Sequence, residues 1–423
     1  MDPWKLISGD DARRLLLAVP PVEEVERVSL RAATGRVLAE ALVAPHDLPR
    51  ERRSAMDGYA GRAADFARAA ETSGPTLSVV AALSAGAVPG AVLASGEVVS
   101  IATGAVVPDD ADAVVMVEFT AREDGTAGTG DRAYVPPGGR VRITQTVPVG
   151  ANVVPAGEDV RAGTTLLARG RRLQARDLSA LATFGLVEVA VFRRPRIAVL
   201  ATGNEICAAD ASPRPGQVRD SNQYVLAAEI EATGATVTWG GIVADDEAAL
   251  RATVARLVAE NDGLILSGGS SVGPKDLTGR VLATLGPPGV LFHGIDIRPG
   301  KPTILARAGA KPVVGMPGFP TSSMVVFEAF VRPMLASLCG ETVLDAWPAT
   351  ARARLARAYS KPAAREDYLR VRLEARDGDV WAEVVPGGSA AISNVLFADG
   401  LAKIPAGLGE VAVGAMVDVR RFS

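Results

Sequence analysis

The stretch after Pro195 alternates short apolar runs with longer amphipathic runs, and this alternation restricts the possible folds more than any other feature of the chain. The apolar runs RIAVLATG (196–203), TVTWGGIV (236–243) and DGLILSGG (262–269) have the composition of buried strands. Between them, SNQYVLAAEIEATG (221–234) and DDEAALRATVARLVAEN (245–261) have the periodicity of helices. Strands that alternate with helices in this way form a mostly parallel sheet with helices on both faces. The sequence therefore predicts a doubly wound α/β domain, which we place at 191–340.

Two other parts of the chain have shorter runs separated by turns, as β-rich domains do. Strand-like segments such as 77–83 and 113–119 lie between Gly, Pro and Asp turns, which predicts an inserted β-rich domain over 46–147. After Gly340, strand alternation returns in YLRVRLEAR, VWAEVVP and VAVGAMVDVRR and predicts a C-terminal β-domain or barrel over 341–423. An N-terminal linker domain, with a first helix packed on the α/β domain, is expected over the remaining segments, 1–45 and 148–190.

The charge balance and the few Cys and His residues exclude several classes of function. Lysine plus arginine number 45 against 48 aspartate plus glutamate, a net charge of −3, so no basic excess is available for general nucleic-acid binding. Cys207 and Cys339 are far apart in sequence, as are His46 and His293, which argues against a disulfide framework and a zinc site. Any metal must then be held by oxygen ligands or by a bound cofactor. Because no signal pattern and no apolar run of roughly 18 residues is present, we expect a cytoplasmic protein without a membrane segment.

The strongest chemical signal is the Gly-rich turn in DGLILSGGSSVG (262–273). A buried strand that runs into Gly268, Gly269, two serines and Gly273 before a helix places backbone N–H groups and hydroxyls at the carboxyl edge of the sheet. Such a turn can hold a phosphate or another anion. An ordinary tight strand-to-helix turn would have the same pattern, since isolated Gly-rich turns are weak signals.

Carboxylates follow several of the predicted strands. Glu205, Asp245, Asp246 and Asp276 would meet at one edge of a parallel sheet, where hard oxygen ligands could hold Mg²⁺ that bridges phosphates. The structural alternative for Asp245 is a helix N-cap, which is a common role for an Asp at the start of a helix. For Glu205 and Asp276 the alternative is a solvated loop carboxylate.

Two rigid loops add cations and hydroxyls near the same edge. IDIRPGKPTI (295–304) places Arg298 and Lys301 on a turn stiffened by two prolines, so that both cations could face an anion with little loss of entropy. VVGMPGFPTSS (313–323) is a similar strand, Pro/Gly loop and helix start, whose hydroxyls could cap the helix or donate to an oxyanion. A bland surface turn is the alternative for the first loop.

Within the β-rich region, Asp57 and Thr103 occupy turn-like settings in SAMDGYA (54–60) and SIATGAVVPDDADAVVMVE (100–118). An Asp-Gly pair is usually a hairpin turn, so the residues alone favour a structural Asp57. No matched Ser-His-Asp or Cys-His motif is present, and His293 is interpreted as a packed strand residue.

Taken in order, these segments resemble the molybdopterin molybdenumtransferase family, which includes bacterial MoeA proteins and the gephyrin E domain. The resemblance implies an elongated linker domain, an inserted β-rich domain, a doubly wound molybdopterin-binding domain and a C-terminal β-barrel. It also implies a homodimer whose active clefts lie between the α/β domain of one subunit and the inserted domain of the other. The matching motifs span nearly the whole chain and are SAMDGYA, ATGAVVPDDADAVVMVE, GEDVRAG, ATGNE, DSN (220–222), the pair at Asp245, SGGSSVGPKD, RPGKP, GMPGFPTS and GGSAAIS (387–393).

The resemblance further implies that molybdate is ligated to the dithiolene of adenylylated molybdopterin, with release of AMP and help from Mg²⁺. The implied partners are a molybdopterin adenylyltransferase and downstream cofactor-processing proteins. The implied catalytic residues are Asp57, Thr103, Glu205, Asp245 and Asp276, of which the last three would also hold the metal. The implied cofactor-binding residues are Ser267, Gly268, Gly269, Ser270, Ser271, Gly273, Arg298, Lys301, Pro317, Pro320 and Ser322.

Several positions depart from the family pattern. Arginines are usual near Val154, an aspartate at Asn204 and a lysine at Gly294, so charged groups are missing at three places. Phe319 replaces the usual Asn of the PGNP loop, and Ala390 stands where His is common. Fewer cations weaken the capture of a highly anionic ligand. Arg53, which stands where Asn is usual, could be one compensating charge, but a solvated side chain is the favoured alternative. Two alternatives therefore stay open: a paralogue that carries molybdenum cofactor without turnover, and a molybdopterin adenylyltransferase.

Overall fold

The computed structural model describes residues 6–67, 74–90, 92–122, 134–269 and 276–422. The described chain forms two compact units with separate apolar cores. The larger unit comprises residues 1–40, 168–182 and 186–423, and the smaller unit comprises residues 41–167 and 183–185. None of the described helices combines the length and the apolarity needed to cross a bilayer.

A six-stranded sheet organises the larger unit within the described residues. Its first four strands run parallel, and the last two continue the sheet antiparallel. The sheet is therefore mostly parallel, but its far edge is an antiparallel meander that the sequence pattern did not predict. The strand order is β16 (Thr236–Val243), β13 (Arg196–Thr202), β17 (Gly263–Ser267), β21 (Lys311–Met316), β20 (Ile304–Ala308) and β18 (Pro288–His293).

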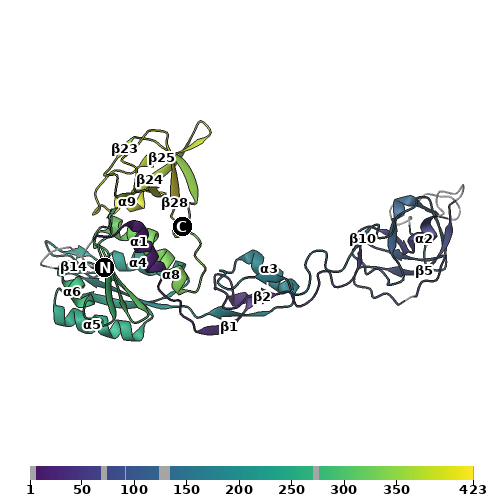
Figure 1. Cartoon of the computed structure of the whole chain (residues 1–423), viewed down its shortest axis with the longest axis horizontal. Coiled ribbons are helices and arrows are strands. Elements are labelled where there is room, and N and C mark those ends of the chain that lie inside the picture. The colour runs from purple at the N-terminus through teal and green to yellow at the C-terminus, as the bar shows by residue number, and fades with distance from the viewer. Residues whose placement is uncertain (1–5, 68–73, 91, 123–133, 270–275, 423) are drawn as a thin grey trace. The chain divides into compact units, whose positions relative to one another are not determined.

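Helices cover both faces of this sheet, because successive side chains of a strand point to opposite sides. On β13, Ile197 and Val199 pack into the cluster formed with α1, α4, α7 and α8, whereas Ala198 and Leu200 pack against α5 and α6. Figure 1 shows α5 and α6 on one side of the sheet and α1, α4 and α8 on the other. The helices are α1 (Gly9–Leu17), α4 (Asn222–Ala232), α5 (Glu247–Glu260), α6 (Leu277–Leu282), α7 (Pro320–Val326), the π-helical turn η5 (Phe327–Val331) and α8 (Arg332–Leu338).

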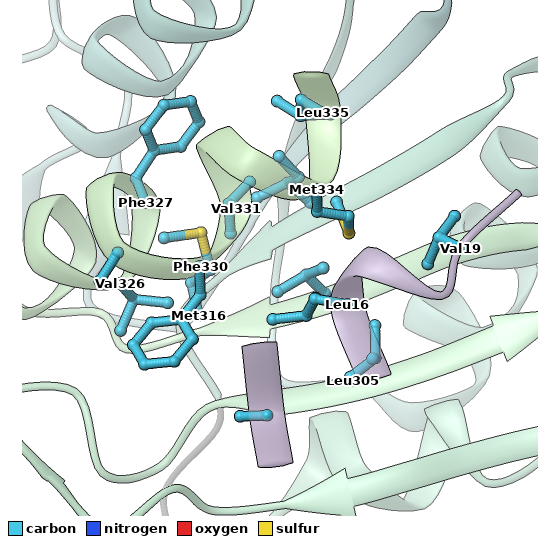
Figure 2. Close-up of a cluster of buried hydrophobic side chains, with 14 of the residues drawn as sticks. Leu16, Val19, Leu305, Met316, Val326, Phe327, Phe330, Val331, Met334 and Leu335 are labelled. Carbon is cyan, nitrogen blue, oxygen red and sulfur yellow. The ribbon is translucent and has the colours of Figure 1, made fainter. Parts of the chain in front are cut away.

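The N-terminal helix α1 contributes to the core of the larger unit. Leu16 and Val19 point into the same cluster as Phe330 and Met334 (Figure 2), and all four side chains are buried. Ser8 caps α1, since its hydroxyl accepts from the Asp11 amide at 3.0 Å. The first helix thus packs on the α/β core.

The C-terminal strands of the larger unit form a closed five-stranded barrel, which confirms the predicted C-terminal barrel. Closure follows because β24 pairs with both β25 and β26. Strand β24 also pairs with β19 (Ile297–Arg298), so the loop that carries Arg298 is attached to the barrel. The barrel strands are β22 (Ala351–Leu355), β24 (Glu366–Arg376), β25 (Asp379–Val384), β26 (Gly400–Ile404) and β28 (Met416–Arg421), accompanied by the pair β23 (Tyr359–Ser360) and β27 (Glu410–Val411) and by α9 (Ser393–Leu396).

The smaller unit is rich in β-structure. Its six-stranded sheet, counted over the described residues, buries apolar side chains on both faces. The order is β7 (Ala113–Met116), β4 (Gly58–Gly61), β6 (Glu97–Ile101), β5 (Thr76–Leu83), β9 (Arg140–Ile143) and β8 (Thr120–Arg122), with α2 (Ala63–Phe66) and η3 (Val117–Phe119) beside it. Two strand pairs of this unit are β2 (Leu42–Val43) with β11 (Thr165–Leu167) and β3 (Arg53–Ser54) with β10 (Val153–Val154).

The remaining elements belong to the larger unit or to its boundary. Strand β1 (Val25–Ser29) pairs antiparallel with β12 (Glu188–Phe192), and η1 (Leu30–Ala32) follows β1. Helix α3 spans Ala175–Thr183, and Gly185 follows it at φ +73°, as expected for a glycine that ends a helix. Strands β14 (Ile206–Cys207) and β15 (Val218–Arg219) form a short parallel pair after β13.

Candidate active site

A cavity of about 610 Å³ lies where the parallel strands β13, β17 and β21 end. Ligand sites of open α/β sheets occur at this carboxyl edge, because the loops that follow the strands converge there. One residue of the barrel region, Ala390, also reaches the cavity. The lining residues are Ala201, Glu205, Ile206, Val218, Arg219, Asp220, Ser221, Asn222, Ser267, Gly268, Gly269, Pro302, Pro317, Gly318, Phe319, Pro320 and Ala390.

The predicted Gly-rich turn forms one wall of the cavity. Gly268 and Gly269 adopt φ values of +100° and +64°, which side chains rarely tolerate. A Cβ at Gly268 would collide with the carbonyl oxygen of Thr202, and a Cβ at Gly269 would lie 2.5 Å from Oγ1 of Thr278. Glycine is therefore required at both positions for the turn to pass this close to its neighbours. Three further predicted residues of the turn, Ser270, Ser271 and Gly273, lie outside the described residues.

Asn222 holds two walls of the cavity together. Its side-chain amide donates to Oγ of Ser267 at 2.7 Å and to the carbonyl oxygen of Gly318 at 2.9 Å. Its Oδ1 atom is buried and has no hydrogen-bond partner among the described residues. Sequence reasoning quoted the DSN motif but assigned no role to Asn222, although a polar residue at the start of a helix beside the Gly-rich turn was a usable signal.

The three predicted metal ligands have different environments. Glu205 lines the cavity. Asp245 joins the loops after β13 and β16, because its Oδ2 accepts from the Asn204 amide at 3.3 Å and its own amide donates to Oδ1 of Asn204 at 3.0 Å. The N-cap role considered for Asp245 belongs instead to Asp246, whose carboxylate accepts from the Ala249 amide at 2.7 Å.

Asp276 is a buried helix cap. Its Oδ1 accepts from the Gly279 amide at 2.9 Å, and its Oδ2 lies 3.5 Å from Nδ1 of His293. Only 9% of its side chain is exposed, so the alternative of a solvated loop carboxylate is wrong. His293 is buried on β18, in agreement with the packed strand residue that the sequence predicted.

The described residues contain no group of three or more His, Cys, Asp or Glu side chains close enough to hold a metal ion. A dedicated all-protein cage for Mg²⁺ therefore does not fit this part of the chain. Mg²⁺ commonly binds through one or two carboxylates together with substrate phosphates, and Glu205 faces the cavity in a position that suits this mode.

Cationic side chains lie on the loops around the cavity. Arg298 and Lys301 are exposed, and Lys301 immediately precedes Pro302, which lines the cavity. Arg219 lines it directly and donates from Nε to the carbonyl oxygen of Ala211 at 3.0 Å. The predicted Arg298 and Lys301 are thus joined by a third cation that sequence reasoning did not identify.

A fourth cation, Arg370, was also missed because it lies in the barrel, distant in sequence from the α/β domain. Its Nη2 donates to the carbonyl oxygen of Gly387 at 3.0 Å, at the start of the loop that carries Ala390 into the cavity. Its Nε is buried without a partner among the described residues. Burial, and to a smaller extent the nearby Arg298, lowers the pKa of the Arg370 guanidinium. Two neighbouring cations, one of them only partly hydrogen-bonded, favour an anion between them.

The predicted loop before α7 contributes apolar surface. Pro317 and Pro320 line the cavity, as does Phe319 between them. Ser322 is buried within α7 and is not part of the cavity lining. Phe319 occupies the N-cap position of α7 but makes no capping hydrogen bond.

Asp57 and Thr103 lie together in the smaller unit. Oδ1 of Asp57 accepts from the Thr103 amide at 2.7 Å and from the Thr103 hydroxyl at 2.9 Å. The amide and then the hydroxyl hold the pKa of Asp57 below its ordinary value, while burial and the Asp57 charge raise the pKa of Tyr134 to about 12. Arg53, considered as a compensating cation, donates to the carbonyl oxygen of Gly104 at 2.9 Å. The smaller unit therefore presents the ionised carboxylate of Asp57 on a turn that the Thr103 hydrogen bonds hold in place.

Comparison with known protein families assigns most of the chain. The family “MoeA N-terminal region (domain I and II)” matches residues 7–185, “Probable molybdopterin binding domain” matches 198–337, and “MoeA C-terminal region (domain IV)” matches 352–422.

Curated relatives and solved structures agree with these matches. The chain is 34% identical to a molybdopterin molybdenumtransferase of Nostoc sp. over 97% of this chain and 92% of the relative. It is 31% identical to the molybdopterin molybdenumtransferase of Bacillus subtilis over 98% of this chain and 93% of the relative. A crystal structure of a molybdopterin biosynthesis MoeA protein from Pyrococcus horikosii superposes with a TM-score of 0.81 at 33% identity, covering 99% of this chain and 100% of that one. The chain belongs to the molybdopterin molybdenumtransferase family.

Proposed function

We propose that this protein transfers molybdate to adenylylated molybdopterin and releases AMP, as a step of molybdenum cofactor biosynthesis. The observation that carries the proposal is the cavity at the carboxyl edge of the parallel sheet, which is bounded by Gly268 and Gly269 and has the cation Arg219 in its lining. The family assignment supports the same activity, since relatives at 31–34% identity over nearly the full chain are molybdopterin molybdenumtransferases.

The turn at Gly268 and Gly269 would receive the substrate phosphates, because backbone N–H groups of such turns donate to phosphate oxygens. Arg298, Lys301 and Arg370 would attract molybdate and stabilise the charge of the leaving AMP. In the reaction, a water would attack the AMP phosphorus, the bond from that phosphorus to the bridging oxygen would break, and AMP would leave with the oxygen of that water. The two dithiolene sulfurs of the substrate would then bind molybdenum and displace one oxo group of molybdate, which leaves as water with the two thiol protons, so no Cys or His of this chain is needed as a ligand.

Glu205 would hold Mg²⁺ together with the substrate phosphates. Asp245 and Asp276, which form no three-carboxylate metal group with Glu205, would instead orient the water that cleaves the phosphoanhydride. Bound Mg²⁺ neutralises phosphate charge and orients the phosphoanhydride. The protein's role is to hold Glu205 at the cavity. The hydrogen bonds between Asn204 and Asp245 fix the loop in which Glu205 follows Asn204.

We also propose that the protein is a cytoplasmic homodimer, with Asp57 and Thr103 of the partner subunit completing the active cleft. The hydrogen bonds between these two residues would present the Asp57 carboxylate in a fixed orientation. Mixing an Asp57→Ala protein with a Glu205→Ala protein tests this arrangement. Partial recovery of activity is expected if the two residues act from different subunits, and no recovery contradicts the shared cleft.

The experiment that tests the function measures AMP release from adenylylated molybdopterin with and without molybdate and with and without Mg²⁺. The native protein should release AMP in a molybdate-dependent manner, and Asp245→Ala and Asp276→Ala should lose this release. Binding of the substrate without release would indicate a cofactor carrier. Consumption of ATP with free molybdopterin would indicate an adenylyltransferase.

A further inference from the structure

Phe319 has an exposure that its structural position does not explain. The side chain is 59% exposed although it is a large apolar group, and it lines the cavity. At the N-cap of α7 a short polar side chain would satisfy a free backbone amide, but Phe319 makes no such hydrogen bond. Its ring also has no aromatic or cationic ring contact within the described residues. The ring therefore serves neither as a helix cap nor as part of a core.

The wall around Phe319 is apolar and rigid. Pro317 and Pro320, which lie on either side of Phe319 in the sequence, line the cavity together with it, and Ala390 lines the same cavity. The Ala390 loop is fixed to the start of α7, because the Thr321 amide donates to the carbonyl oxygen of Ser389 and the Thr321 hydroxyl donates to that of Ala391, both at 3.2 Å. The two departures from the family pattern at Phe319 and Ala390 thus occur in one wall, and each replaces a polar side chain by an apolar one.

We propose that Phe319 is a stacking platform for a fused heteroaromatic ring of the substrate. A flat ring that stacks on Phe319 would gain binding free energy, because its faces are removed from water. Such stacking depends little on which heteroaromatic ring is bound, since each has a π-face. The inference rests on the proposed function only for the identity of the ring, which is either the adenine of the AMP group or the pterin. The size of the cavity suits this ligand class, since small-molecule sites span about 300–1,000 Å³.

The test is calorimetric titration of the full chain with AMP, with ribose 5-phosphate and with 6-hydroxymethylpterin, in the absence of molybdate. Phe319→Asn removes the ring and supplies a capping side chain, so it is expected to fold at least as well as the native protein. Loss of stacking should weaken binding of the stacked ring about 5- to 150-fold. Phe319→Tyr keeps the ring and should stay within about threefold of the native affinity. Phe397→Asn is the matched control, because Phe397 is 62% exposed but lies outside the cavity lining.

Weaker binding of AMP alone, with ribose 5-phosphate unchanged, would identify adenine as the stacked ring. Weaker binding of 6-hydroxymethylpterin alone would identify the pterin. Native protein that binds neither ring compound, Phe319→Asn protein that binds both as tightly as the native protein, or an equal loss in Phe397→Asn would overturn the proposal. Because the titrations involve neither molybdate nor turnover, a failure of molybdate transfer would leave their outcome unaffected, and the two proposals can fail separately.

Discussion

Asp276→Asn separates the two roles that can be assigned to this carboxylate. One role is structural, because Oδ1 accepts from the Gly279 amide and so caps α6. The other is the chemical role proposed at the phosphoanhydride, which needs the negative charge. Asn retains an oxygen acceptor for the cap and removes the charge that lies 3.5 Å from Nδ1 of His293. Asp276→Ala removes both the cap and the charge.

The expected magnitudes follow from these contacts. Loss of an N-cap costs about 1 kcal/mol, and loss of the buried contact with His293 adds about 1 kcal/mol. Asp276→Ala should therefore lower the free energy of unfolding by about 2 kcal/mol, which corresponds to a drop of roughly 3 °C in the midpoint for a unit of about 290 residues. Asp276→Asn should stay within about 1 kcal/mol of the native protein, because the cap is retained.

Thermal unfolding and AMP release, measured on the same preparations, check this reasoning. We expect the Asp276→Asn protein to unfold near the native midpoint but to lose AMP release. The Asp276→Ala protein should unfold at a lower midpoint and also lose AMP release. If Asp276→Asn released AMP at the native rate, the role of Asp276 would be limited to the helix cap, and if Asp276→Ala unfolded at the native midpoint, the energy assigned to the cap would be wrong.

Three further predictions concern the cavity walls and the Asp57–Thr103 pair of the smaller unit. Asn222→Ala removes two buried side-chain hydrogen bonds and should lower the free energy of unfolding by about 2 kcal/mol, measured by urea denaturation; an unchanged midpoint would contradict the bridging role. Gly269→Ala should destabilise the protein more than Gly309→Ala, because both glycines have φ near +60° but only the Cβ at Gly269 meets another atom; equal losses would show that backbone strain alone is responsible. Thr103→Val should raise the pKa of Asp57 toward its ordinary value of 3.8, as read by NMR titration, and an unchanged pKa would contradict the hydrogen bond. Since the folded pKa of Asp57 is depressed, its contribution to stability is complete above the unfolded pKa and is lost as pH falls through the folded pKa.

Much of the fold follows from local patterns in the sequence. Strands and helices alternate after Pro195, and β13, α4, β16 and α5 occupy the segments expected from this pattern. The inner strand β13 is buried on both faces, as predicted, whereas β16 lies at the edge of the sheet and has no fully buried residue, so the prediction of a buried strand was wrong there. The direction of β20 and β18 was not predictable from the same pattern, since a buried strand has a similar composition whether it runs parallel or antiparallel.

Site residues that directly follow a predicted strand could be placed from the sequence. Site residues whose position depends on contacts between segments far apart in the sequence could not. Gly268 and Gly269 directly follow a buried strand, so their place at the sheet edge could be inferred. The burial of Asp276 depends on His293 of another strand, and no local pattern shows it. Arg370 lies near Arg298 because β19 pairs with β24 of the barrel, a contact between segments far apart in sequence.

The measurement that tests the central claim most directly is the stoichiometry of a single turnover with excess protein, adenylylated molybdopterin and molybdate. AMP is quantified by chromatography, and protein-bound molybdenum is quantified by mass spectrometry after removal of free molybdate. The account predicts one molybdenum incorporated for each AMP released, with both lost when Gly269 is replaced by a bulky residue that fills the turn. AMP release without molybdenum incorporation, or incorporation that survives this replacement, would contradict it.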